Sequence, residues 1–479
     1  MADFDRTEFY IDGQWVAPAT AKKLEIIDPS TEGPCGTISL GSAVDVDRAV
    51  RAARKAFPLW ASTPHAERRA LVEELGKVMR SRIKELSEAI SFEMGAPIDF
   101  ATNDQAACGP WHLKGFLKAF DRFEWEREFT AREKIVHEPI GVVGLITPWN
   151  WPVNQIALKM IPAVLIGNTC VLKPSEIAPL SAMVWADFMQ EAGFPAGVFN
   201  LVNGDGPTVG EAMSAHWDID MMSFTGSLRG GAAVMKGSAA TAKKVTLELG
   251  GKSPNIIFAD ANVEKAVRGG VVHCMENTGQ SCNAPTRMIV ERDVYDEAVA
   301  IATDEAEKTR VGNPRDNGAH IGPLVSQAQY DKVQSLIEIG LAEGARCVAG
   351  GIGRPEGFNR GYFARPTVFA DVSNDMRIAR EEVFGPVLAM IPFDGGEEEA
   401  IQIANDTDYG LAAYLHTNDA EKGERVGRAL RAGMVRVNGA AFSMGHPFGG
   451  YKQSGVGREG GIWGLEDFCE TKILAQKYD

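Results

Sequence analysis

The sequence contains no apolar run approaching the roughly 20 residues that a membrane-spanning helix requires. Its first six residues, Met1 to Arg6, are polar and acidic, and they lack the apolar segment of a secretion signal. These two absences predict a cytoplasmic protein without a membrane partner.

Cysteine is sparse and histidine is dispersed. Seven cysteines lie at positions 35, 108, 170, 274, 282, 347 and 469, with no CxxC spacing among them. An odd, scattered set is typical of reduced thiols and argues against a disulfide framework. The eight histidines form no HExxH or HxxxH motif. We therefore expect no metal site.

Positively charged residues are also fewer than negatively charged ones. The 49 Lys and Arg residues are outnumbered by 64 Asp and Glu residues, which gives a formal net charge of −15. This balance argues against a broad surface for nucleic acid or for an anionic membrane. With 45% hydrophobic and 24% charged residues, the composition is that of an ordinary globular protein. A chain of this length is too long for one core, so two or three domains are expected.

Short β-rich runs alternate with helical segments along most of the chain, which is the signature of a parallel α/β architecture. The first half begins with a hairpin at 9–16 that turns at Asp12-Gly13. Three successive strand–helix units then predict a doubly wound, Rossmann-like fold. Their strands are expected at 140–146, 170–173, 198–202 and 221–224, and their helices at 154–166 and 179–192.

The alternation restarts after about residue 250 and predicts a second α/β domain. Strands are expected at 254–258, 286–291, 345–349, 387–393 and 433–437, with helices at 262–275, 293–308 and 326–343. Segments 121–139 and 465–479 alternate charged and apolar residues without a partner nearby in sequence. We expect them to pair with each other at the surface or with another subunit.

Cys282 and Glu248 are the first candidate functional residues. Cys282 ends the segment Asn277-Thr278-Gly279-Gln280-Ser281-Cys282, and Glu248 stands in Leu247-Glu248-Leu249-Gly250-Gly251. A thiol in a glycine-flanked loop and a lone carboxylate beside glycines indicate a nucleophile and a general base. The alternative is a small buried cysteine of the core.

Three further segments follow predicted strands. Gly226 to Gly231 form a glycine-rich turn suited to a pyrophosphate at a helix start, or simply a turn. Lys173-Pro174-Ser175-Glu176 offers a donor and an acceptor for ribose hydroxyls, or a solvated loop. Asn150, after Trp149, offers an amide for a developing oxyanion, or an Asx turn before Pro152.

Taken together, these segments resemble the aldehyde dehydrogenase superfamily over nearly the whole chain. The resemblance is to the NAD(P)-dependent, hydrolytic branch, which does not acylate CoA. It rests on 147–150 (TPWN), 172–176 (LKPSE), 224–227 (FTGS), 247–252 (LELGGK), 279–282 (GQSC), 381–387 (EEVFGPV), 447–452 (PFGGYK) and 454–459 (SGVGRE).

The resemblance implies that Cys282 attacks the aldehyde to give a thiohemiacetal and then a thioester. The Asn150 amide and the Cys282 backbone N–H would hold the oxyanion, and Glu248 would activate the water that hydrolyses the thioester. Glu459 matches a carboxylate associated with proton relay. Rival activities of the same fold are a CoA-acylating semialdehyde dehydrogenase, which Glu248 argues against, and an acyl-phosphate reductase. A non-catalytic scaffold protein is a further alternative.

The resemblance also implies a cofactor and a division of the chain. Residues 1–120 and 140–250 would bind NAD, 251–464 would form the catalytic domain, and 121–139 with 465–479 would bridge subunits in a homodimer or homotetramer. Glu176 would favour NAD, because a carboxylate repels the 2′-phosphate of NADP. The positions implied in cofactor binding are Trp149, Lys173, Ser175, Glu176, Gly226, Ser227, Gly231, Glu382 and Phe384.

Six positions match the substrate tunnel of relatives, namely Trp151, Gln155, Leu158, Ser281, Asn283 and Phe442. None of them is an arginine, so we expect an uncharged aliphatic or aromatic aldehyde, with water as the second substrate.

Overall fold

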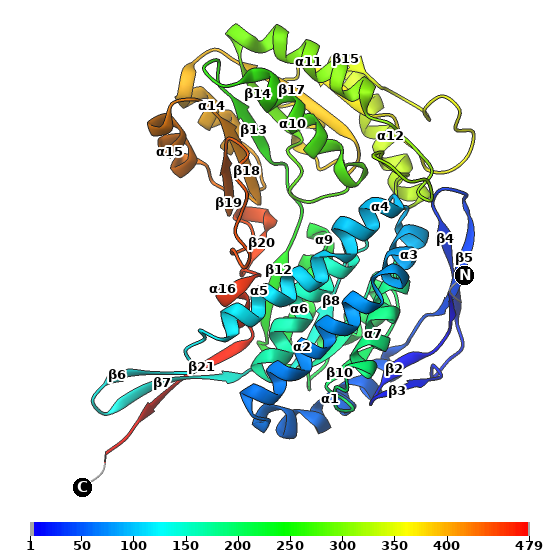
Figure 1. Cartoon of the computed structure of the whole chain (residues 1–479), viewed down its shortest axis with the longest axis vertical. Coiled ribbons are helices and arrows are strands. Elements are labelled where there is room, and N and C mark those ends of the chain that lie inside the picture. Colours follow the sequence, from blue (N-terminus) through cyan, green and yellow to red (C-terminus); the bar gives the residue numbers. More distant parts are fainter. Residues whose placement is uncertain (1–3, 478–479) are drawn as a thin grey trace.

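The computed structural model describes residues 4–477 and contains two large sheets, each covered by helices (Figure 1). One sheet and its helices form the lower lobe in Figure 1, and the other sheet forms the upper lobe. A narrow three-stranded arm projects from the lower lobe. The predicted α/β class is confirmed. No helix within residues 4–477 is long and apolar enough to cross a membrane.

The first sheet has eight strands in the order β20-β12-β11-β8-β9-β10-β2-β3. Its central strands are parallel and carry only buried residues or nearly so, which is the pattern expected of a sheet covered on both faces. The strands are β2 Phe9–Ile11, β3 Gln14–Val16, β8 Val142–Ile146, β9 Thr169–Lys173, β10 Phe199–Leu201, β11 Met221–Thr225, β12 Lys244–Glu248 and β20 Gly455–Val456.

The helices around this sheet include the predicted segments 154–166 and 179–192, which begin and end within two residues of those bounds. They are α1 Ala43–Ser62, α2 His65–Ser81, α3 Ile83–Met94, α4 Ile98–Phe100, α5 Cys108–Phe120, α6 Pro152–Ile166, α7 Leu180–Glu191, α8 Glu211–Ala215 and α9 Leu228–Ser238. The hairpin at 9–16 is confirmed, with Asp12 and Gly13 both at positive φ. A separate three-stranded sheet of β1 Asp5–Arg6, β4 Lys23–Asp28 and β5 Gly33–Ser39 lies beside this lobe.

Parallel pairing brings the ends of the central strands to one edge of the first sheet. Ile146 of β8 pairs with Lys173 of β9, and Thr225 of β11 pairs with Glu248 of β12. The polar segments that follow these strands therefore meet along the edge where open α/β sheets bind ligands. This placement depends on β12, a strand that the sequence pattern did not predict.

The second sheet has seven strands in the order β15-β16-β17-β14-β13-β18-β19. The strands are β13 Pro254–Ile257, β14 Arg287–Glu291, β15 Arg346–Ala349, β16 Thr367–Ala370, β17 Val387–Phe393, β18 Ala412–His416 and β19 Met434–Val437. Its helices are α10 Val263–Met275, α11 Tyr295–Lys308, α12 Gln327–Ala342, α13 Arg377–Arg380, α14 Gly396–Asn405 and α15 Ala420–Ala429.

The arm is a three-stranded antiparallel sheet in the order β21-β7-β6. It consists of β6 Glu126–Thr130, β7 Glu133–Pro139 and β21 Cys469–Ala475, and β21 follows the short helix α16 Gly461–Asp467. Cys469 pairs with Pro139 and Ala475 pairs with Glu133. The expected pairing of segments 121–139 and 465–479 is confirmed over these residues, while their role between subunits stays a prediction.

Candidate active site

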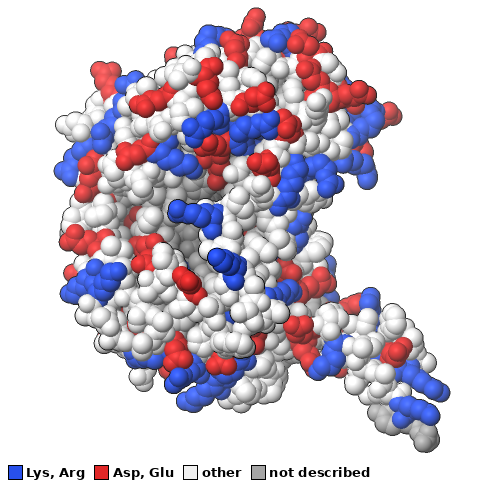
Figure 2. All heavy atoms as spheres, turned by 180° about the vertical axis from the view of Figure 1, so that it is seen from behind, with Lys and Arg blue, Asp and Glu red and all other residues white. Residues whose placement is uncertain are grey.

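A pocket of about 200 Å³ lies where the strand ends of the first sheet face the second lobe. The surface is hollowed between the two lobes, with basic side chains at the rim of the hollow (Figure 2). Both lobes contribute to the pocket, as expected for ligand sites between domains. Its lining consists of Pro148, Trp149, Asn150, Gln155, Thr225, Gly226, Ser227, Leu249, Gly250, Cys282, Gln329, Lys332, Glu382 and Phe384.

Cys282 lies at the end of a loop with unusual backbone geometry. Asn277 and Thr278 have φ of 54° and 58°, in the left-handed region that a β-branched residue such as Thr278 rarely adopts. Gly279 has φ of 69°, and a Cβ at this position would overlap the Gly385 carbonyl. The loop therefore stores strain, of the kind found at functional sites.

Hydrogen bonds from the first lobe hold this loop. The Asn150 side-chain amide donates to the Gln280 carbonyl at 3.0 Å. The Asn150 carbonyl accepts from the side-chain amides of Gln105 at 3.0 Å and Asn277 at 2.9 Å. Asn150 therefore does not form the isolated Asx turn considered as its alternative. Its amide nitrogen carries a second N–H for which the described residues provide no acceptor, and Asn150 lines the pocket.

The Cys282 thiol is electrostatically disfavoured as an anion. Loss of solvation raises the pKa of Cys282 well above its ordinary value, and the negative charges of Glu382 and Glu248 raise it further. Cys282 is nevertheless partly exposed, and it packs against a small apolar cluster that contains Leu411 and Tyr414. It is not sealed in an apolar core. A thiol in this setting is neutral at rest and requires a proton acceptor to become a nucleophile.

Glu248 lies at the end of β12 and is only 4% exposed. Its Oε2 atom has no hydrogen-bond partner among the described residues. Burial raises the pKa of Glu248 well above its ordinary value, and the nearby charge of Glu459 adds to the rise. Lys159 and Arg458 oppose it. A carboxyl group with a raised pKa beside a pocket is suited to accept and release a proton near neutral pH.

Lys159 is a functional candidate that the sequence analysis missed. It is fully buried on α6 and donates to Thr225 Oγ1 at 2.5 Å, to Gln155 Oε1 at 3.3 Å and to the Glu459 carboxylate. A signal was available, because Lys159 is the only charged residue in the helix Pro152–Ile166, where it stands among apolar residues. A buried lysine needs a carboxylate partner, and Glu459 supplies it.

The glycine-rich turn is explained partly by internal packing. A Cβ at Gly226 or Gly230 would lie 2.7 or 2.6 Å from the Phe224 ring, and one at Gly231 would lie 2.8 Å from Leu249. Ser227 begins α9, and its hydroxyl accepts from the Gly230 N–H at 3.2 Å. Gly226 and Ser227 line the pocket, whereas Gly231 is buried behind it.

Lys173 ends β9, and Glu176 lies beside it. The Lys173 ammonium donates to the carbonyls of Pro174 at 2.8 Å and Gly204 at 2.6 Å, and to Glu176 Oε2 at 3.3 Å. Ser175 accepts from the Ile177 N–H at 3.2 Å. The segment is thus a fixed structure and not a solvated loop. None of the three residues lines the 200 Å³ pocket.

On the opposite wall, Glu382 Oε1 accepts from the Gly251 N–H at 2.8 Å. A side chain at Gly250 would collide with the same carboxylate. The rings of Trp149 and Phe384 meet edge to face at 5.3 Å. Gln329 fixes the Phe384 segment by donating to its carbonyl at 2.7 Å. Gln329 and Lys332 were not predicted from the sequence.

The six expected tunnel positions do not all reach this pocket. Gln155 lines it, and the Trp151 indole N–H donates to Ser281 Oγ at 2.8 Å. Phe442 packs in the same apolar cluster as Cys282. Leu158, in contrast, is 2% exposed and belongs to the core of the first lobe. The Asn283 carbonyl accepts from Tyr414 at 2.8 Å.

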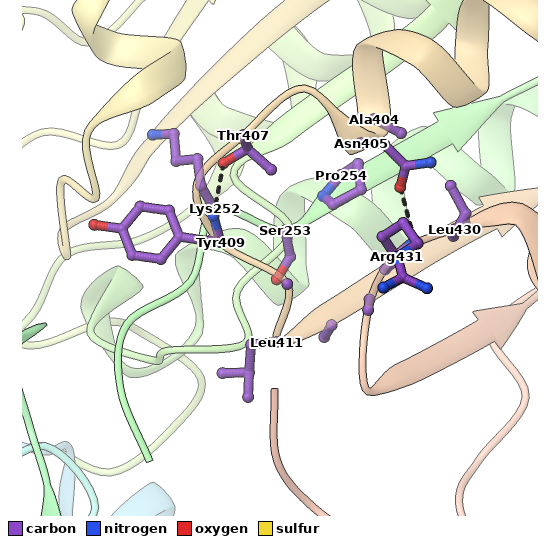
Figure 3. A pocket seen from close by; sticks show the side chains of 14 residues that line it. Lys252, Ser253, Pro254, Ala404, Asn405, Thr407, Tyr409, Leu411, Leu430 and Arg431 are labelled. Carbon is purple, nitrogen blue, oxygen red and sulfur yellow. Dashed lines mark hydrogen bonds between the residues drawn. The ribbon is translucent and has the colours of Figure 1, made fainter. Parts of the chain in front are cut away.

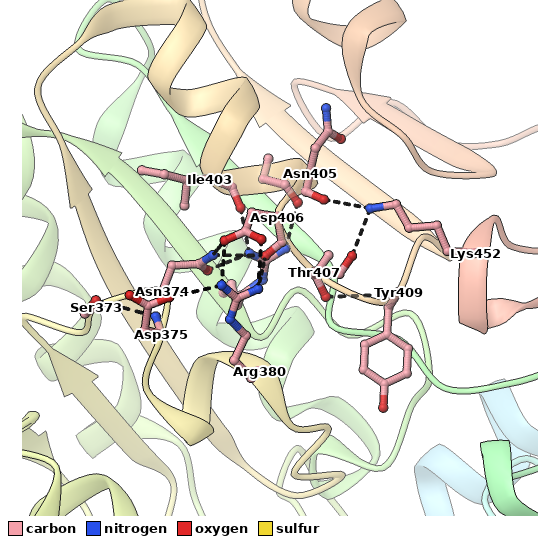
Figure 4. Close-up of polar contacts among 12 residues, drawn as sticks. Ser373, Asn374, Asp375, Arg380, Ile403, Asn405, Asp406, Thr407, Tyr409 and Lys452 are labelled. Carbon is pink, nitrogen blue, oxygen red and sulfur yellow. Dashed lines mark hydrogen bonds and ion pairs between the residues drawn. The ribbon is translucent and has the colours of Figure 1, made fainter.

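The wall behind Cys282 is fixed by cations that bind backbone carbonyls. Lys452 donates to the carbonyls of Asn405 and Thr407, and Arg380 pairs with Asp406 (Figure 4). This loop leads to Leu411, which belongs to the apolar cluster against which Cys282 packs. Lys252, Tyr409 and Leu411 surround a cavity of only about 10 Å³ here (Figure 3). It has room for one water molecule at most, which excludes a substrate.

Within residues 4–477, no group of three or more His, Cys, Asp or Glu residues could hold a metal ion.

Comparison with known proteins gives a consistent result. The model of the aldehyde dehydrogenase family matches residues 15–474. The chain is 51% identical to the 3-succinoylsemialdehyde-pyridine dehydrogenase of a Pseudomonas species, over 98% of both chains. It is 52% identical to a crystal structure of an aldehyde dehydrogenase from Bartonella henselae, with a TM-score of 0.97 over 98% of this chain and 99% of that one.

A second solved structure carries ligands. Aldehyde dehydrogenase C of Pseudomonas syringae, in complex with NAD+ and octanal, is 46% identical, with a TM-score of 0.97. The match covers 98% of this chain and 96% of that chain.

Gly279 provides a test of the loop geometry. Replacement by alanine should destabilise the protein by roughly 1–3 kcal/mol, because the new Cβ would meet the Gly385 carbonyl at a strained φ. The displaced loop should also change the rate at which iodoacetamide alkylates Cys282, measured by peptide mass spectrometry.

The matched control is Gly269→Ala on α10, where a Cβ would meet open space. It should leave both the melting temperature and the alkylation rate near wild type. Equal behaviour of the two variants would show that the left-handed loop does not position Cys282.

Proposed function

The chain belongs to the aldehyde dehydrogenase family, and on this premise we propose that it oxidises an aldehyde to a carboxylic acid through a thioester on Cys282. The observation that carries the proposal is that Cys282 and Asn150 line one pocket between the lobes, while the charge of Glu248 acts on the Cys282 thiol. Glu248 does not itself line the pocket but directly precedes the lining residue Leu249.

In the first step, the Cys282 thiol gives its proton to a base, a role that we assign to the nearby Glu248 carboxylate. The sulfur then adds to the aldehyde carbon and the carbonyl oxygen becomes an oxyanion. The free N–H of the Asn150 amide and the Cys282 backbone N–H stabilise this charge. Loss of one such donor typically lowers the rate by about 10²–10³. Because Gln280 fixes the Asn150 amide at 3.0 Å, the donor is in place before the charge develops.

The residues around the pocket fit a nicotinamide dinucleotide. The start of α9 presents Gly226 and Ser227 to the pocket, Glu382 offers a carboxylate for a ribose hydroxyl, and Trp149 with Phe384 offers aromatic walls. When bound, NAD supplies the acceptor for the hydride whose loss turns the thiohemiacetal into a thioester. Lys173, Ser175 and Glu176 would hold the adenine ribose at the end of β9.

Glu248 then acts on water. As a carboxylate it removes a proton from the water that attacks the thioester carbon, and the Cys282 sulfur leaves as the acid forms. The proton on Glu248 has a neighbouring acceptor in Glu459, which is paired with the buried Lys159. We assign Glu459 and Lys159 to proton transfer, with Gln155 and Thr225 holding the ammonium.

For the substrate, we propose an uncharged aliphatic or aromatic aldehyde. Trp151 and Phe442 provide apolar surface, and Gln155, Ser281 and Asn283 provide neutral polar groups. The solved relative from Pseudomonas syringae binds octanal, an aldehyde of this class.

We also propose a homodimer or homotetramer. The arm projects from the globular part, and it exposes Phe129, Ile473 and Leu474. The strands β21, β6 and β19 lie at the edges of their sheets, and such edges favour pairing with another chain. Light scattering should give a mass of two or four chains, and a monomer at micromolar concentration would contradict the proposal.

Replacement of Glu248 by glutamine tests the hydrolytic role. The thioester should form and then persist, because the amide cannot take a proton from water. Mass spectrometry of the intact protein after one turnover should find the acyl group on Cys282, and added CoA should not release it. An unmodified Cys282, or rapid release by CoA, would contradict hydrolysis by Glu248.

Glu459→Gln is the companion variant. It removes a negative charge that raises the pKa of Glu248 and leaves the Lys159 cation unpaired, and both changes lower that pKa. Glu248 is an active base only above its pKa, so the acid limb of the kcat profile should move to lower pH. An acid limb that stays in place or moves to higher pH would show that the charge of Glu459 does not raise the pKa of Glu248.

We propose that NAD is preferred over NADP because Glu176 repels the 2′-phosphate. The ratio of kcat/KM for the two cofactors should favour NAD, and Glu176→Gln should reduce this ratio by about tenfold, or about 1.4 kcal/mol. Glu191→Gln, at the last residue of α7, is the matched control and should leave the ratio unchanged. A wild-type ratio that favours NADP would overturn the assignment.

A further inference from the structure

The segment 313–325, which lies between α11 and α12 in the chain, holds the loop that carries the nucleophile. The Gly322 carbonyl accepts from the Thr278 hydroxyl at 3.1 Å. The Val325 N–H donates to Gln280 Oε1 at 2.9 Å. Val325 itself is 2% exposed and packs in the core of the first lobe. The left-handed loop is therefore fixed by a segment that is anchored in the opposite lobe.

The same segment contacts the first lobe through its backbone. The Ile98 N–H donates to the Pro314 carbonyl at 2.7 Å. The Gly318 N–H donates to Asp99 Oδ2 at 2.7 Å. Ile98 and Asp99 belong to the short helix α4 of the first lobe. Segment 313–325 thus bridges the two lobes and contacts the catalytic loop as well.

Arg315 adds a charged contact to this bridge. Its guanidinium donates to Asp28 Oδ2 at 2.5 Å and to Ser30 Oγ at 3.1 Å. Asp28 ends β4, and Ser30 follows in the turn that extends towards the upper lobe in Figure 1. β4 belongs with the first lobe, because Ile26 packs in its core. The guanidinium also lies 4.2 Å from the centre of the Phe92 ring on α3, a favourable cation–π contact.

Asp28 is a buried partner with a fixed orientation. It is 4% exposed. Its Oδ1 atom accepts from the Ser30 N–H at 2.9 Å and from the Ser30 hydroxyl at 2.7 Å, which leaves Oδ2 for Arg315. A buried carboxylate without a cation is strongly unfavourable. The bond between Arg315 and Asp28 therefore contributes more than an ion pair between two exposed side chains.

The two lobes approach each other closely beside this ion pair. Gly95 at the end of α3 has a φ of 78°, and a Cβ there would lie 2.6 Å from Pro323 and 2.7 Å from Pro29. A Cβ at Gly322 would overlap the Gly95 carbonyl. Because packing at this point leaves no free space, the position of Gly322 depends on how firmly the lobes are held together.

We infer that Arg315 is a positioning residue, whose ion pair with Asp28 holds segment 313–325 against the first lobe. This segment in turn keeps the Cys282 loop in its left-handed conformation. Without the ion pair, the Gly322 carbonyl loses its fixed place and the strained loop relaxes. The effect on turnover rests on the proposed function, whereas the effect on the thiol is independent of any reaction.

Arg315→Gln tests the inference at a temperature at which melting curves show every variant folded. With octanal, kcat should fall by about tenfold, the effect of losing one charge-assisted hydrogen bond. KM for NAD should stay near wild type, because the residues assigned to NAD lie outside segment 313–325. Iodoacetamide should alkylate Cys282 faster, since the relaxed loop exposes the thiol to water. Arg315→Lys keeps the charge and should recover part of kcat.

Asp28→Asn should act like Arg315→Gln, and the double variant should be no slower than the slower single variant, because both changes remove one interaction. The matched control is Arg346→Gln, which removes an ion pair with Asp371 inside the second lobe, at 2.7 Å. It should leave kcat and the alkylation rate unchanged.

Three results would overturn the inference: additive effects of the two single variants, an alkylation rate of Arg315→Gln equal to that of the control, or a higher KM for NAD at unchanged kcat. A wild-type protein that oxidises no aldehyde would contradict the proposed function alone. The alkylation rates of the variants would still decide the role of Arg315.

Discussion

The hydrogen bonds around Asn150 are the contact on which the arrangement of the pocket depends. Asn150 follows a strand of the first sheet, and Gln280 and Asn277 precede Cys282 in the second lobe, 130 and 127 residues away. These bonds are buried, so the loss of one partner would leave an unsatisfied group at a cost of about 1–3 kcal/mol. They bring a nucleophile from one lobe to the strand ends of the other.

The second constraint is a balance of buried charges. Glu248, Glu382 and Glu459 lie around the pocket, and Lys159 is the buried cation that pairs with one of them. Burial and the charge of Glu459 raise the pKa of Glu248, and burial with the charges of Glu382 and Glu248 raises the pKa of Cys282. The thiol is therefore neutral at rest, and Glu248 holds a proton more readily than an ordinary carboxyl group, so that proton movement accompanies the reaction.

Much of this architecture could be predicted from the sequence, because its central strands are continuous apolar runs that end in polar motifs. The strand β12 escaped prediction since Lys244–Glu248 has a mixed pattern, and β20 contains only two residues. Leu158 was assigned to the tunnel from the family resemblance alone, whereas its side chain on α6 belongs to the buried core of the first lobe. Lys159 was not predicted, because a single lysine among the apolar residues of α6 does not by itself indicate a function. The ion pair between Arg315 and Asp28 could not be predicted, because 287 residues separate its partners in the sequence.

The left-handed backbone at Asn277 and Thr278 also bears on how the two lobes can move. Such a conformation costs about 1–3 kcal/mol at each residue, and contacts from both lobes sustain it. The first-lobe partner Gln105 is 172 residues away from Asn277 in sequence, so the loop keeps this geometry only while the two lobes are docked against each other. Any motion that separates the lobes would therefore also release the backbone that positions Cys282.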